Sequence, residues 1–424
     1  MQRIRKQGRP VCAENRREDS CAVPQTDGAN SLPPPLAAQS FSEAGHLTLR
    51  RTLSVSLAEP LRADLSTTLP ALTGIHTDSD GGLKAEDLVF FDLETTGLSG
   101  GAGTVAFLAA FGRFAGGNYA AIEVDQYLLL DHAGEEDFLR LIEPHFAPRN
   151  PVRPAVIVSY NGKCFDSQII RGRYLVNGMR PPPIACHADL LYPARCLWKK
   201  SLPSCSQSEI ERSVLNMTRL DDIPGSRAPD IWFSFLKTND AAELADVCRH
   251  NLLDIAGLAS ILGALDNIAR DPARYGERYN IDFEGLARRI RKYRHLQSAV
   301  SSETALAERA ALETAARSGS PLAAFLLGKD LLREGRYGAA RSLLASLADR
   351  TDTPLALAAA RALAIDSEWR LLDIERALRY AEKTLPQARA DGALKADSVR
   401  RRERLVRKLE SGCLQPELVQ QPVR

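Results

Sequence analysis

The feature that most constrains the fold of this chain is an apolar segment, LVFFDLETTG (Leu88–Gly97), which carries two acids near its end. The segment predicts a buried β-strand, in which alternate side chains point to the same face. Asp92 and Glu94 therefore share one face, while Leu93 points to the other. Two dehydrated carboxylates side by side are costly unless cations neutralise them, and such oxygen ligands suit Mg²⁺ or Mn²⁺. Two solvated acids on an edge strand are the alternative, and the apolar flanks make it the weaker one.

A third acid follows another apolar run. Residues 155–160, AVIVSY, suit a short buried strand, and Asn161-Gly162 supplies a turn before Asp166 opens a helical segment. Aspartate is a favoured helix N-cap, so a cap and a metal ligand are equally good readings of Asp166 from its residue type. Its location favours the ligand, because sites form where the strands of α/β sheets end.

The fourth acid lies in CRHNLLDIAGL, on a helix that begins near Asp240, where Glu243 completes a capping box. His250 and Asp254 are four residues apart and therefore share one helical face. Taken alone, a partly buried histidine paired with an acid for stability is the better reading.

The chain divides into an α/β part and a helical part. Strands are expected at 88–94, 104–114, 119–130 and 155–160, and helices at 135–146, from 166 and from 240, which gives a mixed sheet flanked by helices. From about residue 301 the pattern is helical and alanine-rich. The spacings from Ala340 to Ala377 and from Pro354 to Pro386 lie close to the tetratricopeptide period of about 34 residues. Two partial units are fewer than such arrays need, so an ordinary helical bundle is an alternative.

Length and composition set the outer limits. A chain of 424 residues suggests two domains plus tails. We expect a disordered tail at 1–40, an N-terminal extension at 41–86, the α/β domain at 87–270, a basic linker helix at 271–300, the helical region at 301–410 and a tail at 411–424. No apolar run is long enough to predict a membrane span, and no secretory signal is visible. The scattered cysteines fit a reduced, cytoplasmic compartment.

Two local features have modest interpretations. The net charge of +2 does not indicate a nucleic-acid binder, and the basic stretch Ala287–His295 is better read as a solvated helix face than as a phosphate contact. Cys186, His187, Cys196 and Cys205 lack the close pairs of structural zinc sites, so packed free cysteines are the better reading. His187 and Asp189 are candidates for lining the cleft without being ligands.

Taken together, DLETTG, NGKCFD and HNLLD resemble the acidic motifs of the DEDD exonucleases, which have a ribonuclease H-like fold, and most of all their YprB-type branch. The resemblance covers about Leu88 to Leu265. It implies that Asp92, Glu94, Asp166 and Asp254 bind two divalent ions, Mg²⁺ or Mn²⁺, and that His250 is the accessory residue. It also implies substrate contacts at Thr95, Thr96 and Asn161.

One departure concerns the histidine. The exonuclease subgroups have either tyrosine three residues before the final aspartate or histidine four residues before it, and here His250 has the tyrosine spacing. One residue rotates a helical side chain by about 100°, which puts the role of His250 as general base in question.

The resemblance implies hydrolysis of phosphodiester bonds in DNA or RNA by a 3′–5′ exonuclease. A structure-specific endonuclease would use the same ions. The alternative from another class is an inactive scaffold that binds nucleic acid or protein through its helical region. The presence of all four acids favours the enzyme.

Overall fold

The computed structural model describes residues 32–75, 83–97, 103–114, 117, 119–150, 152–219, 222–297, 301–350, 353–385 and 392–411. Most of the expected tails lie outside these ranges. Within the segment expected as an N-terminal tail, residues 34–38 form helix α1, and its Leu36 is fully buried.

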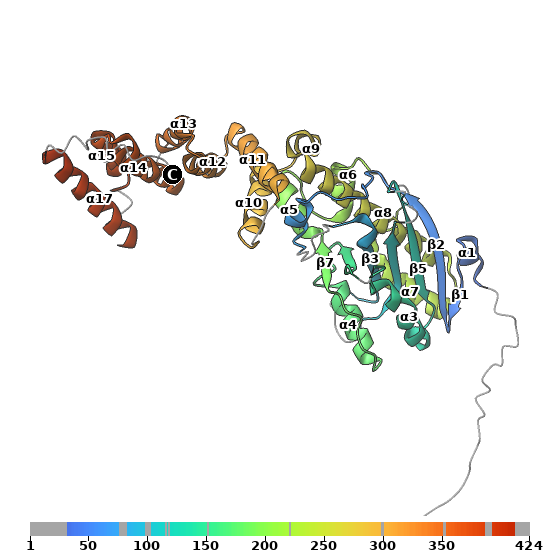
Figure 1. The fold of residues 1–424 in the computed structure, drawn as a ribbon. Helices are drawn as coiled ribbons and strands as arrows, with labels where there is room; N and C mark the ends of the chain where they lie inside the picture. Colours follow the sequence, from blue (N-terminus) through green and yellow to red (C-terminus); the bar gives the residue numbers. More distant parts are fainter. Residues whose placement is uncertain are drawn as a thin grey trace, which may run out of the picture.

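A seven-stranded mixed sheet organises the first part of the chain (Figure 1). The spatial order is β1-β2-β5-β4-β3-β6-β7, in which β3, β6 and β7 run parallel and the other neighbours are antiparallel. The strands are β1 Ser42–Gly45, β2 Thr48–Ser56, β3 Leu88–Thr95, β4 Ala106–Arg113, β5 Ala121–Leu129, β6 Val156–Ser159 and β7 Cys186–Asp189. The α/β fold class with a mixed sheet is therefore confirmed.

Helices cover both faces of this sheet (Figure 1). Phe90 faces α8 and Phe91 faces the opposite layer, where it packs on Phe111 and Phe146. The expected helix at 135–146 ends at Ile142 and continues as a 3₁₀ turn that contains Pro144. The helices are α1 Pro34–Ala38, α2 Leu69–Thr73, α3 Glu135–Ile142, α4 Asp166–Val176, α5 Leu191–Trp198, α6 Gln207–Ser213, α7 Ala228–Thr238, α8 Ala242–Arg270, α9 Pro272–Arg278 and α10 Phe283–Arg294.

Helix α8 is the core helix of the domain. It is long and apolar enough to cross a membrane by length and composition, but 78% of its most apolar window is buried inside the protein. Gly112 on β4 permits its close approach, because a Cβ there would lie 2.6 Å from Ile255 Cγ2. The helix therefore lies directly on the sheet, with its N-terminal half over the ends of the central strands.

The segment expected as an extension, 41–86, contributes to the same sheet. Strand β2 pairs with β5 along its whole length, and β1 pairs with β2. Further along, Ser66 and Thr67 bond to Glu303 of the helical region. The α/β domain is thus wider than residues 87–270.

Beyond α10 the chain is all-helical and extends away from the sheet (Figure 1). Each described helix packs against the next one along the chain, from α10 on α11 to α15 on α17. The alanines on their facing sides are buried. The helices are α11 Ser302–Arg317, α12 Pro321–Arg333, α13 Tyr337–Ala348, α14 Pro354–Asp366, α15 Ile374–Lys383 and α17 Gly392–Glu410, with a π-helical turn at Ser367–Leu371.

The basic stretch Ala287–His295 lies in α10 and at its end. Arg291 and Arg294 both form ion pairs with Glu308, and Arg291 also pairs with Asp330. These arginines hold α10 against α11 and α12. Their guanidinium groups are engaged in ion pairs within the protein rather than free to contact phosphates.

Candidate functional site

Asp92 and Glu94 lie near the end of β3, on the face that α8 covers. A bulge between Glu94 and Thr95 interrupts the pairing with β4 at this point. Glu94 is only 9% exposed, and no hydrogen bond or ion pair reaches its side chain within the described parts of the chain. Burial raises the pKa of both carboxyls well above their ordinary values, and the charges of Asp254 and Asp166 raise them further.

Asp166 is the first residue of α4, and the N-cap position belongs to Phe165. The structure therefore does not use Asp166 as the helix cap. The Asp166 side chain is 6% exposed, and burial raises its pKa to about 7, with a further contribution from the charge of Asp189. A buried carboxyl with this pKa gains stability from a cation beside it.

Asp254 and His250 project from α8 toward the same point. The Nε2 atom of His250 lies 3.2 Å from Asp254 Oδ2, and its Nδ1 atom lies 2.8 Å from Asp222 Oδ1. Among the described residues, Glu94, His250 and Asp254 form a group whose ligand atoms all lie within 4.8 Å of one another. The unusual spacing of His250 thus still brings its ring to the carboxylates.

One cation, Arg219, contacts this acidic group. Its guanidinium lies 2.7 Å from Asp254 Oδ1 and 2.7 Å from Glu211 Oε2, and it also pairs with Asp222. The pKa of Asp222 is lowered because bonds from His250 and Arg219 outweigh its burial. Arg219 therefore neutralises the outer side of the group, while Asp92, Glu94 and Asp166 have no cationic partner in the described residues.

A row of polar side chains crosses the sheet beside Asp92. The sheet register aligns Asp92 with Ala110, Gln126 and Arg51 on neighbouring strands. Asn251 of α8 lies over this row and donates from Nδ2 to Asp92 Oδ2 at 2.7 Å. Gln126 donates to Asn251 Oδ1 at 2.8 Å and accepts from Arg51 Nε at 2.7 Å.

Arginine has no acceptor, so Arg51 fixes which end of the Gln126 amide faces Asn251. The Gln126 amide in turn fixes which end of the Asn251 amide faces Asp92. The Asn251 amide therefore points its donor at Asp92. The orientation of this amide is set by Arg51 on β2, which is separated from β3 by β5 and β4.

The three residues expected to contact substrate lie in the turns beside the acids. Thr95 Oγ1 donates to the carbonyl of Gly97, and Thr96 Oγ1 accepts from the amide of Val105. Both hydroxyls hold the exit from β3. Asn161 is exposed in a left-handed conformation (φ 65°), and its amide donates to Asp189 Oδ1.

Asp189 and His187 organise the next strand end. Asp189 is 1% exposed and also accepts from the amide of Leu191, so it fixes the loop before Asp166. His187 contacts Ser159 Oγ at 2.7 Å, and burial lowers its pKa to about 4. Cys196 and Cys205 donate to backbone carbonyls instead of joining His187, as expected of packed free cysteines.

Comparison with known proteins bears on the same segment. Residues 89–265 match the family model described as RNase_H superfamily. This part of the chain is an RNase H-like domain. The uncharacterized protein YprB of Bacillus subtilis (strain 168) is 35% identical over 192 residues, which cover 44% of this chain and 43% of that protein. The match thus spans less than half the length of this relative.

Nucleases with this fold use divalent metal ions, and the group of Glu94, His250 and Asp254 is a candidate metal site in this chain. The buried carboxylates fit such ions, because within the described residues their charge is compensated only on the side of Arg219.

Proposed function

We propose that this protein is a metal-dependent 3′–5′ exonuclease. The observation that carries the proposal is the convergence of Asp92, Glu94, Asp166 and Asp254 from three distant segments, with three of them lacking a cationic partner in the described residues. These four side chains would hold two divalent ions, Mg²⁺ or Mn²⁺. Bound ions of this kind activate a water and stabilise charge on the attacking and leaving oxygens of a phosphodiester.

The side chains around the acids supply position and proton transfer. Asn251 holds the Asp92 carboxylate by donating to one of its oxygens, which leaves the other for a cation. Asp222 fixes the ring of His250, whose Nε2 faces Asp254. In this proposal that nitrogen would take a proton from the attacking water. The backbone at Thr95 and Thr96, and Asn161, would lie beside the terminal nucleotide.

The helical region from α11 to α17 belongs to the same proposal. Helices α11, α13 and α15 begin at Ser302, Tyr337 and Ile374, spacings close to the tetratricopeptide period of about 34 residues, and the region resembles a short array of that kind. We assign it the role of contacting a protein partner or guiding the nucleic acid, with the whole protein acting in the cytoplasm.

The test is digestion of DNA and RNA oligonucleotides of the same sequence with Mg²⁺ or Mn²⁺. Each is labelled at its 5′ end, so that stepwise shortening from the 3′ end gives a ladder and internal cleavage gives a few fixed fragments. Wild type is compared with Asp92→Ala and Asp254→Asn, and Asp240→Asn is the surface control. A ladder that only the control variant retains supports the proposal.

Two results would overturn it. Fixed fragments from a 3′-blocked strand would make the protein an endonuclease. The second result is that wild type cleaves nothing beyond what the two site variants cleave and still binds the oligonucleotides. The protein would then be a nucleic-acid-binding scaffold.

A further inference from the structure

A second feature beside the acids bears on how a polyanion is held there. The carboxylates repel nucleic acid, so affinity must come from cations outside the group. Arg219 is occupied by three acids. The nearest cation along the chain to Asp166 is Lys163, in the turn that precedes α4.

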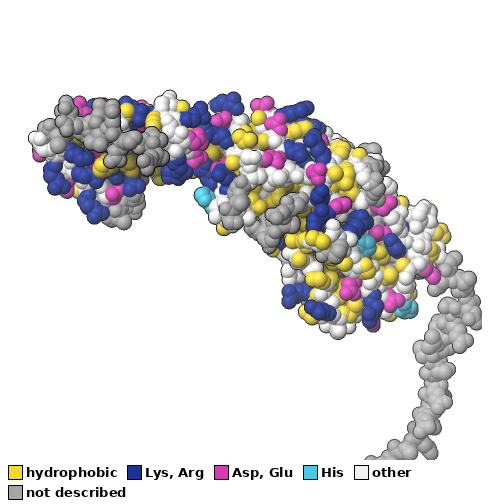
Figure 2. Space-filling model, viewed as in Figure 1, with side chains coloured by type: hydrophobic (Ala, Val, Ile, Leu, Met, Phe, Trp, Pro, Cys, Tyr) yellow, Lys and Arg dark blue, Asp and Glu magenta, His cyan; other side chains and the backbone are white. Residues whose placement is uncertain are grey.

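Lys163 lies at a pocket of about 490 Å³ between α4 and the segment that leads to β7. Arg171 and Arg180 line the same pocket, and its described lining contains no Asp or Glu. All three cations are exposed, and none has an ion pair within the described residues. In Figure 2, Lys and Arg side chains lie over the end of the domain where Figure 1 places α4.

The wall of the pocket includes the residue that follows Asp166 in the chain. Ser167, the neighbour of Asp166, lies in its wall, and its hydroxyl is 3.3 Å from His187 Nδ1. His187 is another wall residue, and the charge of Lys163 contributes to its lowered pKa. A strand of nucleic acid whose end lies at the acids would therefore reach this pocket by passing Lys163.

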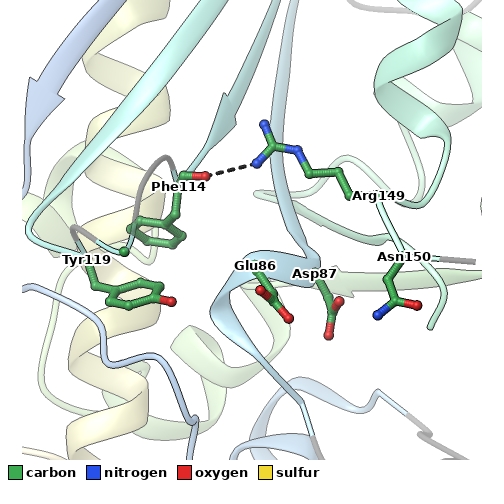
Figure 3. Close-up of a pocket in the computed structure, with 7 residues that line it drawn as sticks. Glu86, Asp87, Phe114, Tyr119, Arg149 and Asn150 are labelled. Carbon is green, nitrogen blue, oxygen red and sulfur yellow. Dashed lines mark hydrogen bonds between the residues drawn. The ribbon is translucent and has the colours of Figure 1, made fainter. Parts of the chain in front are cut away.

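A pocket at the opposite end of β3 provides a contrast (Figure 3). There Arg149 donates to the carbonyl of Phe114 and shares the pocket with Glu86 and Asp87. Glu86 and Asp87 pair with Arg153 rather than with Arg149. This pocket therefore holds acids beside its cation, whereas the described lining of the pocket near α4 contains no Asp or Glu.

We propose that Lys163, Arg171 and Arg180 bind the backbone phosphates of a single strand of nucleic acid whose end lies at the acidic group. This inference rests on the proposed nuclease function and adds the path of its substrate. The size of the pocket suits one nucleotide unit rather than a duplex. The guanidinium groups of Arg171 and Arg180 suit phosphate oxygens, and the proline rim at 181–183 shapes the far wall.

The test compares two full-length variants with the same change in charge. The pocket variant carries Lys163→Gln, Arg171→Gln and Arg180→Gln. The control carries Arg62→Gln, Arg350→Gln and Arg379→Gln, which change exposed cations without ion partners among the described residues. Thermal melting first establishes that both fold, and the single variant Arg171→Gln serves if the pocket variant does not.

Binding of a fluorescein-labelled 12-nucleotide single strand is followed by anisotropy in Ca²⁺ at several salt concentrations. Each lost phosphate contact weakens binding about fivefold at 0.1 M salt and lowers the salt slope by about 0.7. The pocket variant should therefore lose up to about a hundredfold in affinity and about 2 in slope. A blunt duplex should bind weakly to all three proteins.

Hydrolysis separates the pocket from the acids. With Mn²⁺, the pocket variant should have a higher KM than wild type for the 12-nucleotide strand. Its hydrolysis of bis(p-nitrophenyl) phosphate should be unchanged, because this substrate is too small to span both sites. An equal loss in the control variant, or an equal loss on the small substrate, would overturn the assignment. If wild type hydrolyses neither substrate, the proposed function itself fails; if it hydrolyses both and the pocket variant binds the strand normally, only the pocket assignment fails.

Discussion

Replacing Asn251 by aspartate tests the polar row that crosses the sheet. The substitution keeps the shape of the side chain and the acceptor that faces Gln126, but it turns the donor that faces Asp92 into a second acceptor at about 2.7 Å. A buried hydrogen bond to a charged group contributes about 1.5–3 kcal/mol. With the added buried charge, we expect a loss of about 3–5 kcal/mol at pH 8.

The pH dependence follows from the sign of the new pKa shift. The two facing carboxyls share a proton in the folded variant and lose it when the chain unfolds, so their folded pKa is raised. The variant is therefore closest to wild type at low pH, and its deficit grows as the pH rises through that pKa. Urea unfolding at pH 5 and pH 8, followed by tryptophan fluorescence, measures this, because Trp198 and Trp232 are buried in the domain.

Two further variants make the test specific. Asn280→Asp is the matched control, since Asn280 is exposed and aspartate tolerates its left-handed backbone. The exchange of Asp92→Asn with Asn251→Asp again places a donor opposite an acceptor, and it should recover most of the lost stability. The reasoning is refuted if Asn251→Asp matches the control at pH 8, or if the exchange is no more stable than Asn251→Asp alone.

Three other changes have defined outcomes. Burial raises the pKa of Asp166 from 3.8 to about 7, so the free energy of unfolding of the metal-free protein should fall by about 4 kcal/mol between about pH 4 and pH 7. Asp166→Asn should flatten that part of a plot of urea midpoint against pH. An unchanged slope would contradict this. Gly112→Ala should cost about 1–3 kcal/mol because the new Cβ meets α8, whereas Gly172→Ala, with open space around it, should stabilise by up to about 1 kcal/mol in the same assay. Arg219→Met leaves buried acids uncompensated and should lower the free energy of unfolding by about 3–5 kcal/mol at pH 8. Added Mn²⁺ should restore part of the melting temperature. If the loss is no greater than that of the exposed variant Arg212→Met, Arg219 does not stabilise the acidic group.

The central strands and the long helix were predictable because their apolar periods are strong. Strand β3 is buried on both faces, and the alternation of its side chains is sufficient to place Asp92 and Glu94 together. The strands β1 and β7 were not predicted, since neither four-residue segment is an apolar run like that of β6, and β1 is mostly exposed. Strand β2 reads as an amphipathic segment, and only its pairing with β5 reveals that it belongs to the sheet.

The acids of the site were predictable from their motifs, but their partners were not. Asn251 lies inside the HNLLD motif, yet its role depends on the depth at which α8 crosses Ala110. Gln126 occupies an inward position of a predicted strand, which is a weak signal of a buried polar contact. Arg219 lies 35 residues from Asp254 in a segment with no periodicity, so no sequence pattern joins them.

The N-terminal hairpin has a practical consequence for anyone dividing this protein into fragments. A piece trimmed to the residues that match the family model would begin at 89 and omit β2. Strand β5 would then present its unpaired edge to solvent, which invites association between copies. The same cut would remove Arg51, and the amides of Gln126 and Asn251 would be free to turn over. The activity of such a fragment would therefore not represent that of the intact chain. A fragment that begins before β1 keeps both the pairing of β2 with β5 and Arg51.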